Sequence, residues 1–184
     1  MTIEPLAEKK DSLALRRGKA ALKCGLYALF VFACFWLTTA LSWFEAAGVH
    51  AQLMTAAVVL VGVFEGRRAG AAAGAFAGAL MDAVIARSEA FYTLFFMLAG
   101  FVCGLLCEQL FRRRLGAAFL FTAAALCAQE ILFFAIFYLI AGRAGMDALM
   151  RVALPEGLFS LALSPLLYPP ARGLYKLTGG RALL

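Results

Sequence analysis

The chain alternates between long apolar runs and short charged segments. The first run is unbroken from Cys24 to Phe44, and five more follow, with most of the charged residues between them. A helix needs about 20 apolar residues to cross the hydrocarbon core of a bilayer. The pattern therefore predicts six transmembrane helices, at Cys24–Phe44, Ala46–Phe64, Ala69–Ala86, Ala90–Cys107, Leu115–Gly142 and Val152–Ala171.

Composition agrees with this interpretation. Hydrophobic residues make up 64% of the 184 positions and charged residues only 15%, against roughly 25% charged in soluble domains. The segments between runs are short, so we expect one all-α membrane domain, residues 24–178, after a basic tail, residues 1–23. Two alternatives stay open for the tail: an amphipathic helix on the inner membrane surface, or a disordered anchor.

The placement of lysine and arginine tests the number of spans. With the amino terminus in the cytoplasm, 14 of the 17 basic residues fall on the cytoplasmic side, and only Arg87, Arg143 and Arg151 fall outside. Cytoplasmic loops of membrane proteins carry the excess of positive charge. We therefore expect six spans with both termini in the cytoplasm. The basic residues on the cytoplasmic side face anionic lipid headgroups. This explains the net charge of +6 without a nucleic-acid partner.

A row of glycines recurs every fourth residue and ends in an acid, at Gly66, Gly70, Gly74, Gly78 and Asp82. In water, each glycine within a helix costs about 1 kcal/mol relative to alanine. In a membrane, small residues at this spacing let a neighbouring helix backbone approach closely. The row therefore predicts a packing stripe on the third span and places that span centrally in the bundle.

The occupant of the stripe is either another helix of the same chain or a partner protein. Every six-helix bundle needs internal packing, which favours the first. Gly100 and Gly104 form a second, shorter pair with the same spacing in the fourth span.

Three polar residues inside predicted spans are candidates for a buried polar site. Asp82 lies near the outer end of the third, and Gln129 and Glu130 lie near the middle of the fifth. A carboxylate at such depth faces the bundle interior or a polar cavity. Glu130 is accordingly a ligand or proton site, or else part of a hydrogen bond between helices.

Catalytic and metal-binding patterns are absent from the sequence. The chain has no asparagine and one histidine, His50, and no HExxH motif. Cys103 and Cys107 stand one helical turn apart, but a zinc site needs further ligands. We expect no enzyme activity, no metal and no cofactor.

Several features together resemble the rod-shape-determining MreD family. The first is the length with the predicted topology, and the second is the Gly-x-x-x-Gly-x-x-x-Asp stretch at Gly74, Gly78 and Asp82. The third is the aromatic run from Phe133 to Tyr138. The fourth is the last predicted span, which contains proline (Gly157 to Pro165) and closes on the basic residues Arg172 and Lys176. The resemblance covers about residues 25 to 178.

The resemblance implies a non-enzymatic subunit of the cell-wall elongation machinery in the bacterial cytoplasmic membrane. Its implied partners are the single-span protein MreC, the glycan polymerase RodA and a penicillin-binding transpeptidase. The glycine stripe would then pack the bundle or accept the helix of MreC.

A second interpretation belongs to another class. The substrate-capturing subunit of an energy-coupling-factor vitamin transporter is also a six-helix protein of about this size. In that case Asp82, Glu130, Trp36 and Trp43 would border a pocket open to the outside. The first span lacks the Ala-x-x-x-Ala pair that such subunits use to dock.

Overall fold

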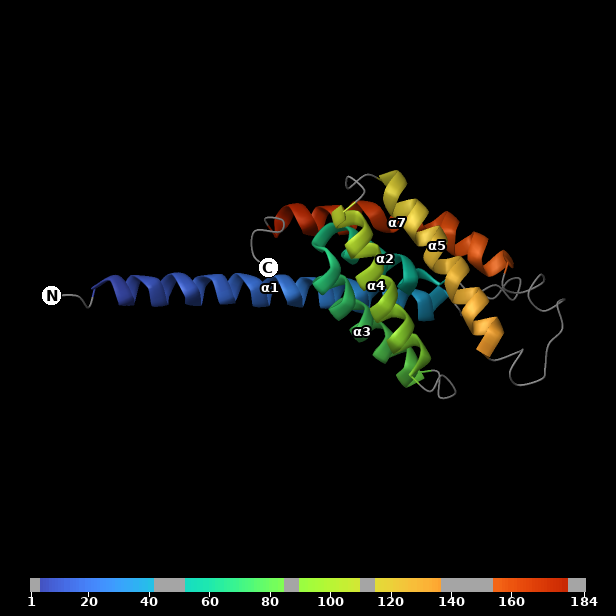
Figure 1. Cartoon of the computed structure of the whole chain (residues 1–184), viewed down its shortest axis with the longest axis horizontal. Coiled ribbons are helices and arrows are strands. Elements are labelled where there is room, and N and C mark those ends of the chain that lie inside the picture. The colour runs from blue at the N-terminus through green and yellow to red at the C-terminus, as the bar shows by residue number, and fades with distance from the viewer. Residues whose placement is uncertain (1–3, 42–51, 85–89, 110–114, 137–153, 179–184) are drawn as a thin grey trace.

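The computed structural model describes residues 4–41, 52–84, 90–109, 115–136 and 154–178, and all regular secondary structure in these ranges is helical, as the sequence predicts. The helices, shown in Figure 1, are α1 (Glu4–Leu41), α2 (Leu53–Glu65), α3 (Arg67–Val84), α4 (Phe91–Gln109), α5 (Leu115–Phe134) and α7 (Leu154–Leu177). The predicted span ends at Phe44, Ala86 and Gly142, and the starts at Ala46 and Val152, lie outside the described residues.

Three of the described helices are long and apolar enough to cross a membrane: Ala20–Ala40 within α1, Phe91–Gln109 and Gly116–Phe133. α2 is an apolar helix of 13 residues, but it rises only about 20 Å, less than the roughly 30 Å of a bilayer core. The three long helices make the chain compatible with a membrane protein.

α1 is one continuous helix of 38 residues that passes through the predicted boundary at residue 23. In Figure 1 its amino-terminal part projects from the bundle in line with the part that packs against other helices. Residues 4–23 are thus helical and continue directly into the candidate span Ala20–Ala40. Alanine, leucine, lysine and glutamate in this segment favour uninterrupted helix.

The central helix is α2. All 13 of its residues are buried, and it contacts α1, α3, α4, α5 and α7. The prediction that the third span is central is wrong, because α3 buries only Gly70, Gly74, Ala77 and Gly78. A stripe of small residues marks close contact along one side. A central position instead requires apolar side chains on every side, and the LMTAAVVLVGVFE sequence of α2 has them.

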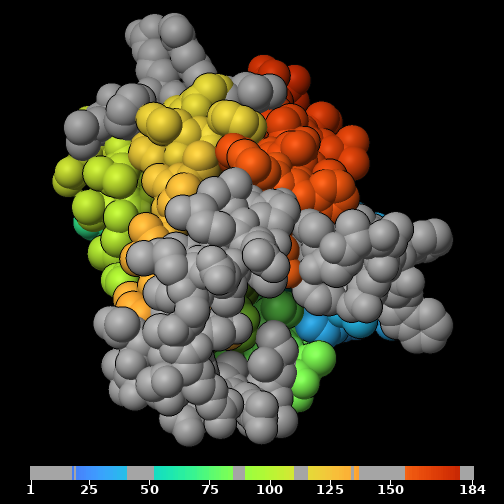
Figure 2. Space-filling model, turned by 90° about the vertical axis from the view of Figure 1, so that its right-hand side faces the viewer, coloured from blue at the N-terminus to red at the C-terminus, as the bar shows by residue number. Residues whose placement is uncertain are grey.

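α5 and α7 complete the bundle. Figure 2 shows α4, α5 and α7 next to one another on one face, and α5 contacts both of the others. α7 also packs on α2, where the Phe64 ring lies 5.4 Å from the Tyr168 ring and 5.6 Å from the Tyr175 ring, between centroids. These contacts place the carboxyl ends of α2 and α7 at the same end of the bundle.

Prolines do not interrupt α7. The helix begins at Leu154, so Pro155 occupies its first turn, where a missing N–H group breaks no helical hydrogen bond. The helix continues past Pro165, Pro169 and Pro170 to Leu177. The described part of the predicted sixth span is therefore one helix, which starts beside Pro155.

Candidate functional site

The glycine stripe of α3 is filled by α4. A Cβ atom added to Gly70, Gly74 or Gly78 would collide with the backbone of α4. Gly70 faces Gly100, and Gly78 faces Thr93, so the two helices run antiparallel. Backbones approach this closely only where no side chain separates them. The stripe packs two helices of the same chain and leaves no space for a partner helix.

The contact extends beyond α3 and α4. Gly104 lies against Gly66 and Arg67 where α3 begins, and a Cβ atom at Gly62 of α2 would lie 2.7 Å from the Gly100 oxygen. Three helices therefore meet through glycine. Sequence reasoning missed Gly62, although it continues the four-residue series one step back from Gly66, because that step crosses a predicted span boundary.

Asp82 accepts three hydrogen bonds from the first turn of α4. The Tyr92 amide donates to Oδ1 at 3.2 Å, and the amide and hydroxyl of Thr93 donate to Oδ2 at 2.9 and 2.6 Å. The first N–H groups of a helix lack partners within it, and this end carries partial positive charge. The acid at the end of the glycine row is therefore a cap that ties α3 to α4.

Glu108 makes the reciprocal contact. Its Oε1 accepts a hydrogen bond from the Arg67 amide at 3.3 Å, and its Oε2 lies 3.9 Å from Arg67 Nε. Each helix of the antiparallel pair thus caps the amino terminus of the other. Sequence reasoning missed Glu108 because the residue lies just beyond the predicted end of the fourth span, at Cys107.

Gln129 and Glu130, in the carboxyl-terminal third of α5, join a chain of hydrogen bonds to α2. Thr55 Oγ1 donates to Gln129 Oε1 at 2.6 Å, and Gln129 Nε2 donates to Gln52 Oε1 at 2.5 Å. Gln52 Nε2 then donates to Glu130 Oε1 at 2.7 Å. Gln52 was not expected to take part. An amide inside a predicted apolar span is the signal that would have found it.

These groups border a chamber of about 410 Å³. Every described helix contributes to its lining, and the polar lining residues are Thr38, Thr39, Gln52, Thr55, Tyr92, Gln129, Glu130 and Glu156. Of the four residues expected to border a transporter pocket, Glu130 lines this chamber. Trp36 is exposed on α1, Asp82 caps α4, and neither is among the described residues that border the chamber. Trp43 lies outside the described residues.

A buried ion pair lies at the other end of the bundle. Lys23 Nζ is 2.6 Å from Glu65 Oε2, and the two side chains are 2% and 0% exposed. The Tyr27 hydroxyl donates a hydrogen bond to Glu65 Oε1 at 2.7 Å. Buried charges require partners of this kind. Sequence reasoning assigned Lys23 to the tail and missed this pair. Lys23 lies just before the first predicted span and Glu65 just after the second, and two successive antiparallel helices bring these positions to the same end of the bundle.

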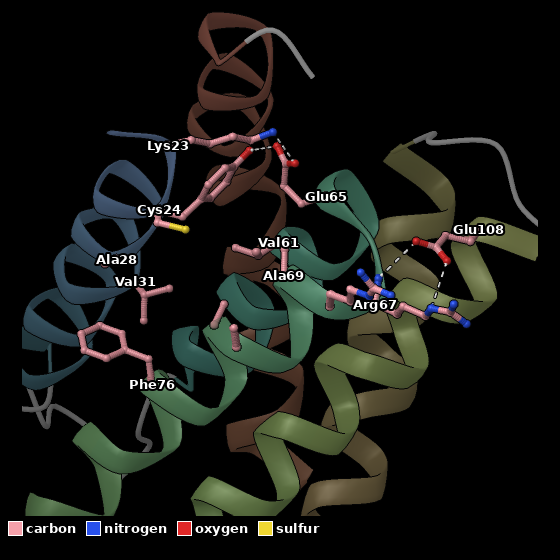
Figure 3. Close-up of a pocket in the computed structure, with 14 residues that line it drawn as sticks. Lys23, Cys24, Ala28, Val31, Val61, Glu65, Arg67, Ala69, Phe76 and Glu108 are labelled. Atoms are coloured by element: carbon pink, nitrogen blue, oxygen red, sulfur yellow. Dashed lines mark hydrogen bonds and ion pairs between the residues drawn. The ribbon is translucent and has the colours of Figure 1, made fainter. Parts of the chain in front are cut away.

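A groove of about 640 Å³ lies beside this ion pair, between α1 and α3, with Val61 and Glu65 of α2 also lining it (Figure 3). Its walls are small or apolar: Ala28, Val31, Ala69, Ala72, Ala73 and Phe76. Arg67, Arg68 and Glu108 also line it, and the Arg67–Glu108 contact is drawn in Figure 3. The groove therefore has apolar walls. The charged residues that also line it include the ion pairs Lys23–Glu65 and Arg67–Glu108.

Comparison of the chain with models of known protein families, with curated proteins and with solved structures gives no match.

Proposed function

We propose that this protein is a non-enzymatic, multi-pass subunit of the bacterial cell-wall elongation machinery, similar to MreD. The motif resemblance over about residues 25 to 178 supports this. In the proposed topology, six helices span the cytoplasmic membrane and both termini lie in the cytoplasm. The contacts Lys23–Glu65 and Phe64–Tyr175 support it, because they bring basic segments of α1 and α7 to the end of the bundle where α2 meets α3.

The observation that carries the proposal is the groove between α1 and α3. Helices associate in a bilayer through close packing, and small residues permit the closest approach. The alanines on both walls provide such a surface, and Ala72 is exposed. The membrane helix of MreC docks in this groove. RodA and its transpeptidase associate with the resulting pair.

Co-purification tests the proposal. The tagged full-length chain is extracted from its own membranes in mild detergent, and the proteins recovered with it are identified by mass spectrometry. Ala72→Trp fills the groove, whereas Ala124→Trp places the same side chain on an exposed part of α5 that is not among the groove residues. We expect MreC with the wild type and with Ala124→Trp, and at least about tenfold less with Ala72→Trp, corresponding to about 1.4 kcal/mol.

Two results would contradict the proposal. Equal recovery of MreC with Ala72→Trp would exclude the groove as its docking surface. Recovery of a transmembrane coupling subunit with paired ATPases, in place of MreC, would identify the chain as a transporter subunit.

A further inference from the structure

The chamber bordered by Gln52 and Glu130 lies at the opposite end of α2 from the Lys23–Glu65 pair and plays no part in the proposed scaffold. Its volume of about 410 Å³ falls within the range of roughly 300 to 1,000 Å³ found for small-molecule sites. Described residues from six helices line it. It is thus a separate cavity of ligand size.

Its polar lining is organised to accept hydrogen bonds. Thr38 and Thr39 direct their hydroxyl protons to the carbonyl groups of Cys34 and Phe35, at 2.8 and 3.0 Å. The Thr38 hydroxyl oxygen can still accept a hydrogen bond through its lone pairs. The amide chain from α2 and α5 donates in one direction and ends on the carboxylate of Glu130. A ligand that donates hydrogen bonds fits this lining.

The charge of the chamber favours a cation. Glu130 and Glu156 both line it, and no lysine, arginine or histidine is among its described lining residues. Only one oxygen of Glu130 is used by Gln52. Burying the Glu130 carboxylate in an apolar bundle is costly, and a bound cation would offset that cost.

Aromatic rings form another part of the lining. Phe35, Tyr92, Phe96 and Phe133 border the chamber. The Tyr92 ring centroid lies 5.8 Å from that of Phe96 and 6.5 Å from that of Phe133. Aromatic faces attract cations and also contact the hydrocarbon part of an organic ligand.

We propose that the chamber binds a small organic cation with a primary ammonium group. The ammonium, which carries three N–H donors, donates hydrogen bonds to the Glu130 carboxylate and the Thr38 hydroxyl. The organic part of the ligand packs against the aromatic rings. An inorganic cation would use the carboxylates and leave the aromatic lining without a role.

Calorimetric titration of the purified full-length chain in detergent tests this inference. The probe is 2-phenylethylamine, which is charged at pH 7, and its matched neutral control is 2-phenylethanol. We expect saturable binding of the amine, with one molecule per chain, and no saturable binding of the alcohol. Glu130→Gln keeps an oxygen for Gln52 but removes the charge, so the Kd for the amine rises at least about tenfold.

Two further variants complete the design. Glu8→Gln, near the amino-terminal end of α1, removes a carboxylate that is not among the described lining residues of the chamber and leaves the Kd unchanged. Thr38→Val removes one acceptor without changing the shape of the side chain and raises the Kd severalfold, which keeps the test decisive if Glu130→Gln does not fold. Equal binding of the alcohol, no binding of the amine, or unchanged binding in the chamber variants would overturn the inference.

Discussion

At the scale of single residues, the acidic side chains that sequence reasoning found hard to place are held by neighbouring helices. Asp82 accepts hydrogen bonds from α4, Glu108 accepts one from α3, and Glu65 pairs with Lys23 of α1. In each case the partner is a helix terminus or an opposite charge, which offsets the cost of removing a carboxylate from water.

The cap at Asp82 is testable by truncation. Asp82→Ala leaves the first N–H groups of α4 without their acceptor, and we expect the free energy of unfolding to fall by about 1 to 2 kcal/mol. Asp82→Asn keeps an acceptor oxygen and loses only the charge, so it costs less. Denaturant unfolding in detergent measures both variants. If Asp82→Ala were as stable as the wild type, the carboxylate would not act as a cap.

The ion pair predicts a non-additive response. Lys23→Met or Glu65→Leu alone strands a buried charge, and each variant loses about 3 to 5 kcal/mol of stability. The double variant removes both charges, so we expect it to be more stable than either single variant. A double-mutant cycle from unfolding midpoints gives the coupling energy. Additive losses would show that the two side chains contribute independently.

At the scale of elements, α3 and α4 form the closest-packed pair described in this bundle. Glycine faces backbone at Gly70, Gly74, Gly78, Gly100 and Gly104. An acid at the end of each helix caps the start of the other. The four-residue spacing of glycine on both helices therefore permits their close approach, and the two acids tie each helix to the start of the other.

A single methyl group tests this packing. Gly74→Ala places a Cβ against the Phe96 carbonyl and separates the helices, and we expect a loss of about 1 to 3 kcal/mol. Gly25→Ala is the matched control, because no described atom lies within 4 Å of the added carbon on α1. It raises stability by up to about 1 kcal/mol through helix propensity. Thermal unfolding of both variants decides the matter, and equal effects would contradict the close contact.

The sequence predicted the helices of this pair closely, since runs starting at Ala69 and Ala90 became helices starting at Arg67 and Phe91. It also identified the glycines and polar residues that take part in contacts. It did not predict the position of α2 or the partners Gln52, Glu65 and Glu108. Hydropathy gives the extent of each run, whereas these partners lie at helix ends, where their neighbours come from other helices.

At the scale of the whole molecule, the bundle has two ends of different character. The Lys23–Glu65 pair and the groove lie toward one end, and the chamber lies toward the other. The proposed topology places the groove toward the cytoplasm and the chamber toward the outside, because basic residues gather on the cytoplasmic side. A partner helix and a small cation would then occupy separate sites on one scaffold.

Reporter fusions test this orientation. A green fluorescent protein joined after Leu184 is expected to fluoresce, and an alkaline phosphatase at the same position to remain inactive, because the proposed topology places the carboxyl terminus in the cytoplasm. The same phosphatase inserted after Arg87 is expected to be active. An active phosphatase after Leu184 would contradict the six-span topology.

Photo-cross-linking in living cells tests the proposed docking of MreC in the groove most directly. A photoreactive amino acid replaces Ala72 in the groove or, as a control, Ala124 on α5, in cells that assemble the intact machinery. If MreC docks in the groove, a cross-link to MreC forms from position 72 and none forms from position 124. A cross-link to MreC from position 124 alone, or from neither position while MreC still co-purifies, would contradict the groove as the docking surface.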